Sequence, residues 1–136
     1  MIKIIIGRKG SGKTKLLVDM VNEATKTSLG NVVCIEKGDT LTYSVTHKAR
    51  LIDADSFAIS GYGEYYGMVA GIKSGNHDVT HIFGDATLRI GTRDYEELCA
   101  FFERISKIED VEFVFTVSAD KEELPKKLFD IAEVCN

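Results

Sequence analysis

Residues that bind metals or form disulfides are scarce in this sequence of 136 residues. The three cysteines, Cys34, Cys99 and Cys135, lie far apart, and their spacing fits neither a zinc site nor a disulfide framework. The three histidines likewise form no ligand pattern. We therefore interpret the cysteines as small buried hydrophobic residues in a reducing cytoplasm.

Long apolar runs and an excess of positive charge are also missing. No apolar run approaches the roughly 20 residues of a membrane-spanning helix, and the N-terminus enters a strand without a visible signal peptide. The net charge of −4 gives no support to nonspecific nucleic-acid binding. With 44% hydrophobic residues the chain can bury a core, and its length predicts one domain covering residues 1–136. We expect a cytoplasmic domain with no membrane insertion and no clear nucleic-acid signal.

A glycine-rich run near the N-terminus carries the strongest functional signal. Residues 7–14 read Gly-Arg-Lys-Gly-Ser-Gly-Lys-Thr and fit G-x-x-x-x-G-K-[ST], the phosphate-binding loop or Walker A motif. Glycines let the backbone turn its N–H groups toward an anion, and the following helix adds the positive end of its dipole. Lys13 would reach the β and γ oxygens of a triphosphate, and the Thr14 hydroxyl would coordinate Mg²⁺.

The surroundings of this run have the strand-then-helix order that the motif requires. Residues 1–6 are a short β-branched run, and apolar residues recur at helical spacing from Leu16 to Ala24, with Gly30 as the expected C-cap. The residues expected to contact a nucleotide are Gly7, Lys9, Gly10, Ser11, Gly12, Lys13, Thr14, Lys15 and Ser118.

A phosphate-binding loop also needs an acidic residue for Mg²⁺ at the end of a neighbouring strand. Asp85 follows the apolar run Ile82-Phe83-Gly84 and fits this role, with a turn or cap aspartate as the alternative. Many ATPases place a catalytic glutamate directly after that aspartate, but here the position is Ala86. Glu36 ends the expected second strand and could serve as the catalytic base, because strand carboxyl ends line the ligand crevice of an open parallel sheet. The alternative is an exposed strand-end carboxylate.

Four further polar residues could act on a bound phosphate. Thr116 and Ser118 stand at the end of the expected strand 111–117, where a hydroxyl could sense the γ-phosphate or hold the attacking water. Arg89 and Arg93 lie close together in a loop and could stabilise transition-state charge. The alternatives are edge hydroxyls and solvated arginines.

Strand and helix signals alternate along the chain, which predicts an α/β fold with a mostly parallel sheet. The alternation of Leu41, Tyr43 and Val45 with polar residues predicts a small β-hairpin within 40–52. A glycine-rich helix is expected over 57–74, and it is either broken near its first glycines or packed by close backbone approach. The remaining expected elements are a strand at 79–84, a loop at 86–93, a helix capped at 94–97, a helix start at 122–125, and a last strand or helix end at 130–135.

The motif and the order of elements resemble the P-loop NTPase superfamily and, within it, a minimal RecA-like ATPase core. The resemblance implies a three-layer sandwich with about five parallel strands, in which the loop strand is flanked by the Asp85 strand and by strand 111–117. It also implies Glu36 as the base and Asp85 as the Mg²⁺ ligand. The chain is shorter than typical members, and without an N-K-x-D run GTP specificity is disfavoured.

These observations predict a Mg²⁺-dependent ATP-binding protein with weak or partner-stimulated ATPase activity, because the loop is intact but no glutamate follows Asp85. A small-molecule kinase, for a nucleoside or a cofactor precursor, is a second hypothesis that rests on Arg89 and Arg93. A third is a non-enzymatic, nucleotide-dependent switch or assembly module that binds a protein partner or a second copy. Its partner surface would contain Tyr62, Tyr65, Tyr66 and Met68.

Overall fold

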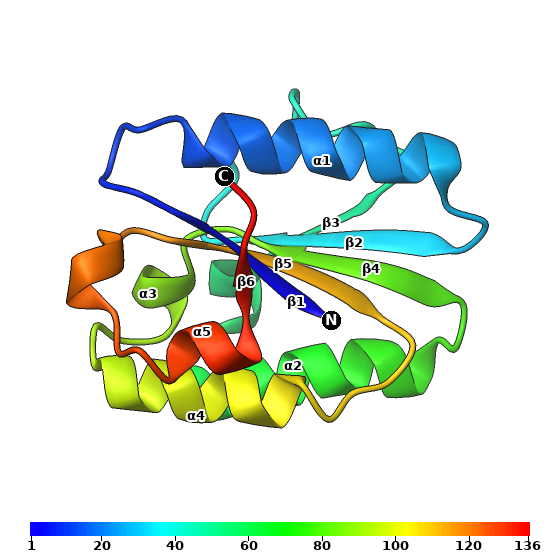
Figure 1. Cartoon of the computed structure of the whole chain (residues 1–136). Helices are drawn as coiled ribbons and strands as arrows, with labels where there is room; N and C mark the ends of the chain where they lie inside the picture. The colour runs from blue at the N-terminus through cyan, green and yellow to red at the C-terminus, as the bar shows by residue number, and fades with distance from the viewer.

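Six parallel strands form the central layer of the protein (Figure 1). The computed structural model describes all residues from Met1 to Asn136. The strands stand in the order β3-β2-β4-β5-β1-β6, and every neighbouring pair is parallel. Their bounds are Ile2–Ile6 for β1, Asn31–Glu36 for β2, Arg50–Asp53 for β3, Val79–Gly84 for β4, Glu112–Val117 for β5 and Glu133–Val134 for β6.

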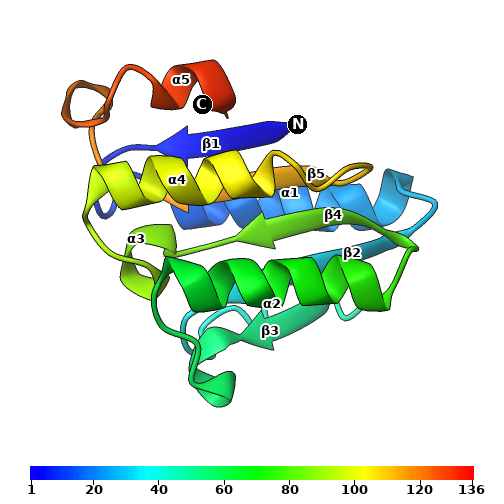
Figure 2. The same ribbon diagram turned by 90° about the horizontal axis from the view of Figure 1, so that it is seen from below.

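Helices cover both faces of this sheet and make a three-layer sandwich, as predicted. The helix α1 lies on one face, while α2, α4 and α5 lie on the other (Figure 1, Figure 2). Two buried apolar clusters match these layers, one of 12 residues on the α1 side and one of 24 residues on the α2 and α4 side. No helix is long and apolar enough to cross a membrane. The helices are α1 (Lys13–Thr27), α2 (Tyr62–Gly75), α3 (Thr87–Ile90), α4 (Tyr95–Ile105) and α5 (Leu128–Ile131), with short 3-10 turns at Ala54–Phe57 and Lys121–Glu123.

The order of the strands corrects one expectation. The loop strand β1 is flanked by β5 and β6, and β5 separates it from β4, the strand that ends before Asp85. The prediction placed β4 directly beside β1. In this central position Phe113 and Phe115 of β5 are fully buried, and Phe115 packs against the rings of Tyr65 and Phe101. The carboxyl end of β5 therefore lies next to the phosphate-binding loop.

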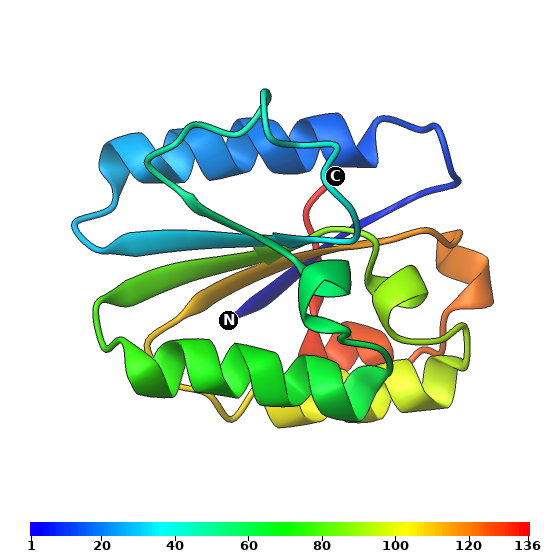
Figure 3. The same cartoon turned by 180° about the vertical axis from the view of Figure 1, so that it is seen from behind.

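The predicted β-hairpin at 40–52 is wrong. Residues 37–49 form turns that run beside α1 (Figure 3), and the only strand in this region is β3, which pairs in parallel with β2. Leu41 and Val45 are buried, but Tyr43, which an alternating strand would place on the same face, is fully exposed. The apolar spacing is thus that of a turn of helix, about every four residues, and not that of a strand.

The segment 57–74 is not one continuous helix. It is interrupted at Gly61, which agrees with the first of the two alternatives, a break near the first glycines. Helix α2 begins at Tyr62, and Gly61 precedes it with φ of 89°, a left-handed backbone value. Space around Gly63, Gly67 and Gly71 is open, with no atom within 4 Å of an added Cβ. No other backbone therefore approaches these three glycines closely. They lower the stability of the helix, and no tighter packing compensates for that loss.

Smaller corrections concern the ends of elements. Ser28, and not Gly30, caps α1 at its C-terminus, because Gly30 already lies against the backbone carbonyl of Asp78. The expected loop 86–93 contains the single helical turn α3. The last segment, residues 130–135, was left open between strand and helix end, and it contains both: Asp130 and Ile131 end α5, and Glu133–Val134 form β6 beside β1.

Two glycine substitutions should change stability in opposite directions. At Gly84 an added Cβ would overlap the Tyr65 hydroxyl and lie 2.6 Å from the ring of Phe115. We expect Gly84→Ala to lower the free energy of unfolding by about 1–3 kcal/mol through overpacking. Gly71→Ala, in open space on α2, should raise it by about 0.5–1 kcal/mol. Urea denaturation checks both, and destabilisation by Gly71→Ala would contradict the open space that surrounds it.

Candidate functional site: a cationic cavity at the phosphate-binding loop

In the loop formed by residues 7–12, the backbone has positive φ angles at its glycines. Gly10 and Gly12 have φ of 83° and 91°, in the left-handed region where other residues are strained. Gly12 is also the N-cap of α1, so the chain passes directly from the loop into the helix. The first N–H groups of α1 are left without helical partners and face the loop, which is the arrangement that binds anions.

Lys13 lies across this loop. Its ammonium group donates to the carbonyl oxygen of Arg8 at 2.8 Å and lies 3.5 Å from the hydroxyl of Ser11. The side chain is only 8% exposed. Burial lowers the pKa of the Lys13 ammonium, and the negative charge of Asp85 opposes that shift. An anion in the loop would replace a neutral carbonyl as the partner of a buried positive charge.

A cavity of about 550 Å³ opens beside the loop, at the carboxyl end of the sheet. Its volume falls in the range of small-molecule sites. Five of its lining residues carry positive charge and none is a carboxylate, although the chain has a net charge of −4. The lining consists of Lys9, Gly10, Gly12, Lys13, Thr14, Lys15, Ala86, Leu88, Arg89, Arg93 and Ser118. Seven of the nine expected nucleotide contacts are in this set, and Gly7 and Ser11 are not.

Asp85 is not part of the cavity lining, but its carboxylate contacts two hydroxyl groups, one of them on the lining residue Thr14. Thr14 Oγ1 donates to its carboxylate, at 3.1 Å from Oδ2 and 3.3 Å from Oδ1. Thr116 Oγ1 donates to Oδ1 at 2.7 Å and accepts from the N–H of Ala86 at 3.1 Å. Thr116 is 2% exposed and does not line the cavity, so its hydroxyl contacts Asp85 from the protein interior.

The pair Thr14 and Asp85 fits a magnesium ion. Mg²⁺ holds six oxygens at about 2.0–2.1 Å, so neighbouring ligands lie about 3 Å apart. The 3.1 Å between Thr14 Oγ1 and Asp85 Oδ2 matches that spacing. No group of three or more His, Cys, Asp or Glu side chains could hold a metal by itself. These two residues would therefore supply two ligands, and phosphate and water would supply the others.

Glu36 is at the carboxyl end of β2 but does not line the cavity. Its Oε1 accepts from the N–H and hydroxyl of Thr40 at 3.0 and 3.2 Å, and from the N–H of Leu41 at 3.2 Å. Burial raises the pKa of the Glu36 carboxyl above its ordinary value, against the lowering effect of these hydrogen bonds. The side chain thus fixes the turn that follows β2, and its role as a base stays a prediction.

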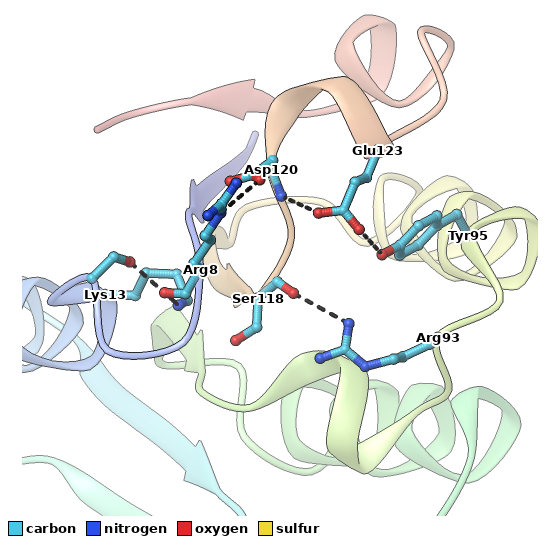
Figure 4. A network of polar contacts seen from close by, with 8 residues as sticks. Arg8, Lys13, Arg93, Tyr95, Ser118, Asp120 and Glu123 are labelled. Carbon is cyan, nitrogen blue, oxygen red and sulfur yellow. Dashed lines mark hydrogen bonds and ion pairs between the residues drawn. The ribbon is translucent and has the colours of Figure 1, made fainter.

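Arg8 links the loop to the segment after β5, a connection that the sequence did not reveal. Its guanidinium pairs with Asp120 at 2.9 Å, and the N–H of Gly7 donates to the carbonyl of Ala119 at 3.0 Å (Figure 4). Asp120 and Glu123 form a capping box, and Tyr95 donates to Glu123 at 3.3 Å. The Asp-x-x-Glu spacing of residues 120–123 could have predicted the capping box from the sequence.

The tyrosines proposed for a partner surface mostly pack inside the protein. Tyr65 is fully buried and stacks on Phe101, and Tyr62 donates its hydroxyl to the carbonyl of Thr92 at 2.6 Å. The guanidinium of Arg104 covers the ring of Tyr66. These three side chains therefore join α2 to α4 and to the sheet.

No family model and no curated protein matches this chain. Among solved structures it resembles flagellar accessory protein FlaH from Methanocaldococcus jannaschii, with a TM-score of 0.60 and 18% sequence identity. The match covers 96% of this chain and 65% of the FlaH chain, so the chain spans somewhat less than two thirds of that protein. At this identity the likeness concerns the fold alone, a parallel sheet covered by helices on both faces.

Substitution of Glu36 should separate its charge from its hydrogen bonds. Because burial raises the folded-state pKa of Glu36, folding favours the protonated form, and wild-type stability falls as pH rises from about 4.5 through the raised pKa. Glu36→Gln keeps the accepting oxygen without the charge, so we expect equal or higher stability at pH 7 and a flatter pH profile. Glu36→Ala should lose about 1–3 kcal/mol, because three donors lose their acceptor. Chemical denaturation between pH 4 and 7 measures both, and a Gln variant as unstable as the Ala variant would contradict this account.

Removal of the Thr116 hydroxyl should affect both the fold and the site. Thr116→Val leaves the N–H of Ala86 without an acceptor and removes the shorter of the two hydrogen bonds to Asp85 Oδ1, so we expect a loss of about 1–3 kcal/mol in the free energy of unfolding. Thr116→Ser keeps the hydroxyl and serves as the control. If both variants lose the same stability, the methyl group and not the hydroxyl is what matters.

Proposed function

We propose that this protein binds ATP together with Mg²⁺ in the cavity beside residues 7–14. The observation that carries the proposal is the convergence of Lys13, Thr14 and Asp85. A buried ammonium, a hydroxyl and a carboxylate meet where the loop enters α1, at the edge of a cavity lined by cations. This combination suits a triphosphate with its metal ion, which presents both negative oxygens and a hard cation.

Hydrolysis is proposed to be slow or to depend on a partner. In-line attack on the γ-phosphate needs a group that orients or deprotonates water. Ala86 follows Asp85, no carboxylate lines the cavity, and the Oε1 atom of Glu36 is occupied by Thr40 and Leu41. A partner that moved the turn after β2 would release Glu36, which is one physical route to stimulation.

Phosphoryl transfer to a small molecule is the second candidate, and the position of Arg89 and Arg93 on the cavity wall favours it. One assay distinguishes it from hydrolysis. Hydrolysis yields ADP and inorganic phosphate in equal amounts, whereas a kinase supplied with its acceptor forms ADP without releasing phosphate.

Lys13→Ala tests the proposed nucleotide site. The ammonium of Lys13 is the buried charge that would meet the phosphates, so we expect at least about a tenfold loss in affinity for Mg²⁺–ATP. Lys26→Ala, an exposed lysine in the last turn of the same helix, is the matched control and should bind as the wild type does. Isothermal titration calorimetry gives the affinities, and phosphate release is followed in parallel. Equal affinity in the wild type and Lys13→Ala would overturn the proposal.

A further inference from the structure

The cavity has two walls of different construction. One wall is the loop itself with Lys13 and Thr14, which would hold the nucleotide phosphates. The other is the segment after Asp85, which contributes Arg89 and Arg93 to the lining. In Figure 4, Arg93 and Lys13 approach Ser118 from opposite sides.

Arg89 is carried on a turn that the core holds in place. Leu88 and Ile90, its neighbours in α3, are 4% and 1% exposed, and the carbonyl of Ile90 accepts from the N–H of Gly61 at 2.7 Å. Ala86 starts this turn with φ of 54°, an uncommon value for a residue with a side chain. Arg89 is the only exposed residue of α3, so the turn presents one guanidinium from a rigid base.

Neither arginine is neutralised by the protein. The four ion pairs of the structure involve other cations, and none includes Arg89 or Arg93. Arg93 donates one N–H to the carbonyl of Ser118 at 3.3 Å, which fixes its direction and leaves its other donors unused. The guanidinium of Arg89 takes part in no ion pair, and only the backbone N–H of this residue donates, to the carbonyl of Ala86. Two guanidinium groups in one cavity, both without a carboxylate, are a receptor for an oxyanion.

The nucleotide accounts for only part of this positive charge. Mg²⁺ would cancel part of the triphosphate charge, and Lys13 with the N–H groups of the loop would pair with more of it. Lys9 adds a further cation on the loop side of the cavity, while Lys15, also in the lining, is paired with Asp19 at 3.2 Å. The positive charge of Arg89 and Arg93 therefore exceeds what a single metal-bound triphosphate would need.

We propose that Arg89 and Arg93 form a second anion subsite of the cavity, which binds a phosphate group carried by a second small molecule. A phosphate monoester carries about −1.5 to −2 charge at neutral pH and offers three oxygens, which suits two guanidinium forks better than the two oxygens of a singly charged carboxylate. This inference rests on the proposed nucleotide site and names the class of molecule that would share it.

The test measures binding of inorganic phosphate to protein saturated with Mg²⁺ and a non-hydrolysable ATP analogue. Equilibrium dialysis with labelled phosphate should give one phosphate per nucleotide-loaded chain. Arg89→Gln/Arg93→Gln should weaken phosphate binding about tenfold or more and change analogue affinity less than about threefold. Arg50→Gln/Lys107→Gln removes two exposed cations outside the cavity lining and should leave both affinities unchanged. Acetate should compete at least about tenfold less well than phosphate.

Three results would overturn the subsite. The loaded wild type could bind no phosphate, the arginine variant could bind it unchanged, or acetate could compete as well as phosphate. A loss of analogue affinity without separate phosphate binding would instead assign the arginines to the nucleotide. If the analogue itself does not bind, the proposed function fails, and phosphate is then titrated into Lys13→Ala with and without the arginine substitutions. Arginine-dependent binding there supports the subsite independently, and its absence removes it.

Discussion

Asp85 joins three parts of the chain that are distant in sequence. Its carboxylate accepts from Thr14 in the first turn of α1 and from Thr116 on β5, and its backbone N–H donates to the carbonyl of Ile35 on β2 at 2.8 Å. The phosphate-binding loop is thereby tied to β4 although β5 lies between their strands. Every other feature of the site depends on this connection, because it fixes where the loop, the cavity and the arginine turn stand relative to one another.

The cavity beside residues 7–14 is lined by cations, although the protein as a whole carries a net negative charge. Five of its 17 lysines and arginines line a single cavity, whereas the whole chain has a net charge of −4. Two carboxylates are kept out of the lining by hydrogen bonds. The carboxylate of Glu36 accepts hydrogen bonds from Thr40 and Leu41 in the turn after β2. The carboxylate of Asp120 pairs with Arg8, and neither of these two residues is in the lining. The lining is therefore cationic, which suits an anion, and it contains no carboxylate.

The sequence predicted the fold class and the elements with clear periodicity. The alternation of strands and helices indicated a layered parallel sheet, and the loop motif located β1 and α1. It misassigned residues 40–52, because Leu41, Tyr43 and Val45 fit an alternating strand until the exposure of Tyr43 shows otherwise. The strand order was also wrong in one place, because the residues of a strand do not record which other strands it pairs with. In the structure β5 lies between β4 and β1, with Phe115 packed against Tyr65 of α2 and Phe101 of α4.

For the candidate site, the sequence by itself determined the local chemistry. Gly7 to Thr14 specify a glycine turn that leads into a helix, a geometry that suits an anion, because glycine conformations and the start of a helix are local properties of the chain. Only the tertiary structure decided the rest. The pairing of Asp85 with Thr14, the position of Glu36 outside the lining, and the presence of Arg89, Arg93 and Lys13 in one cavity all depend on contacts between residues far apart in sequence. Such contacts follow from how strands are ordered and helices packed, and no local pattern records them.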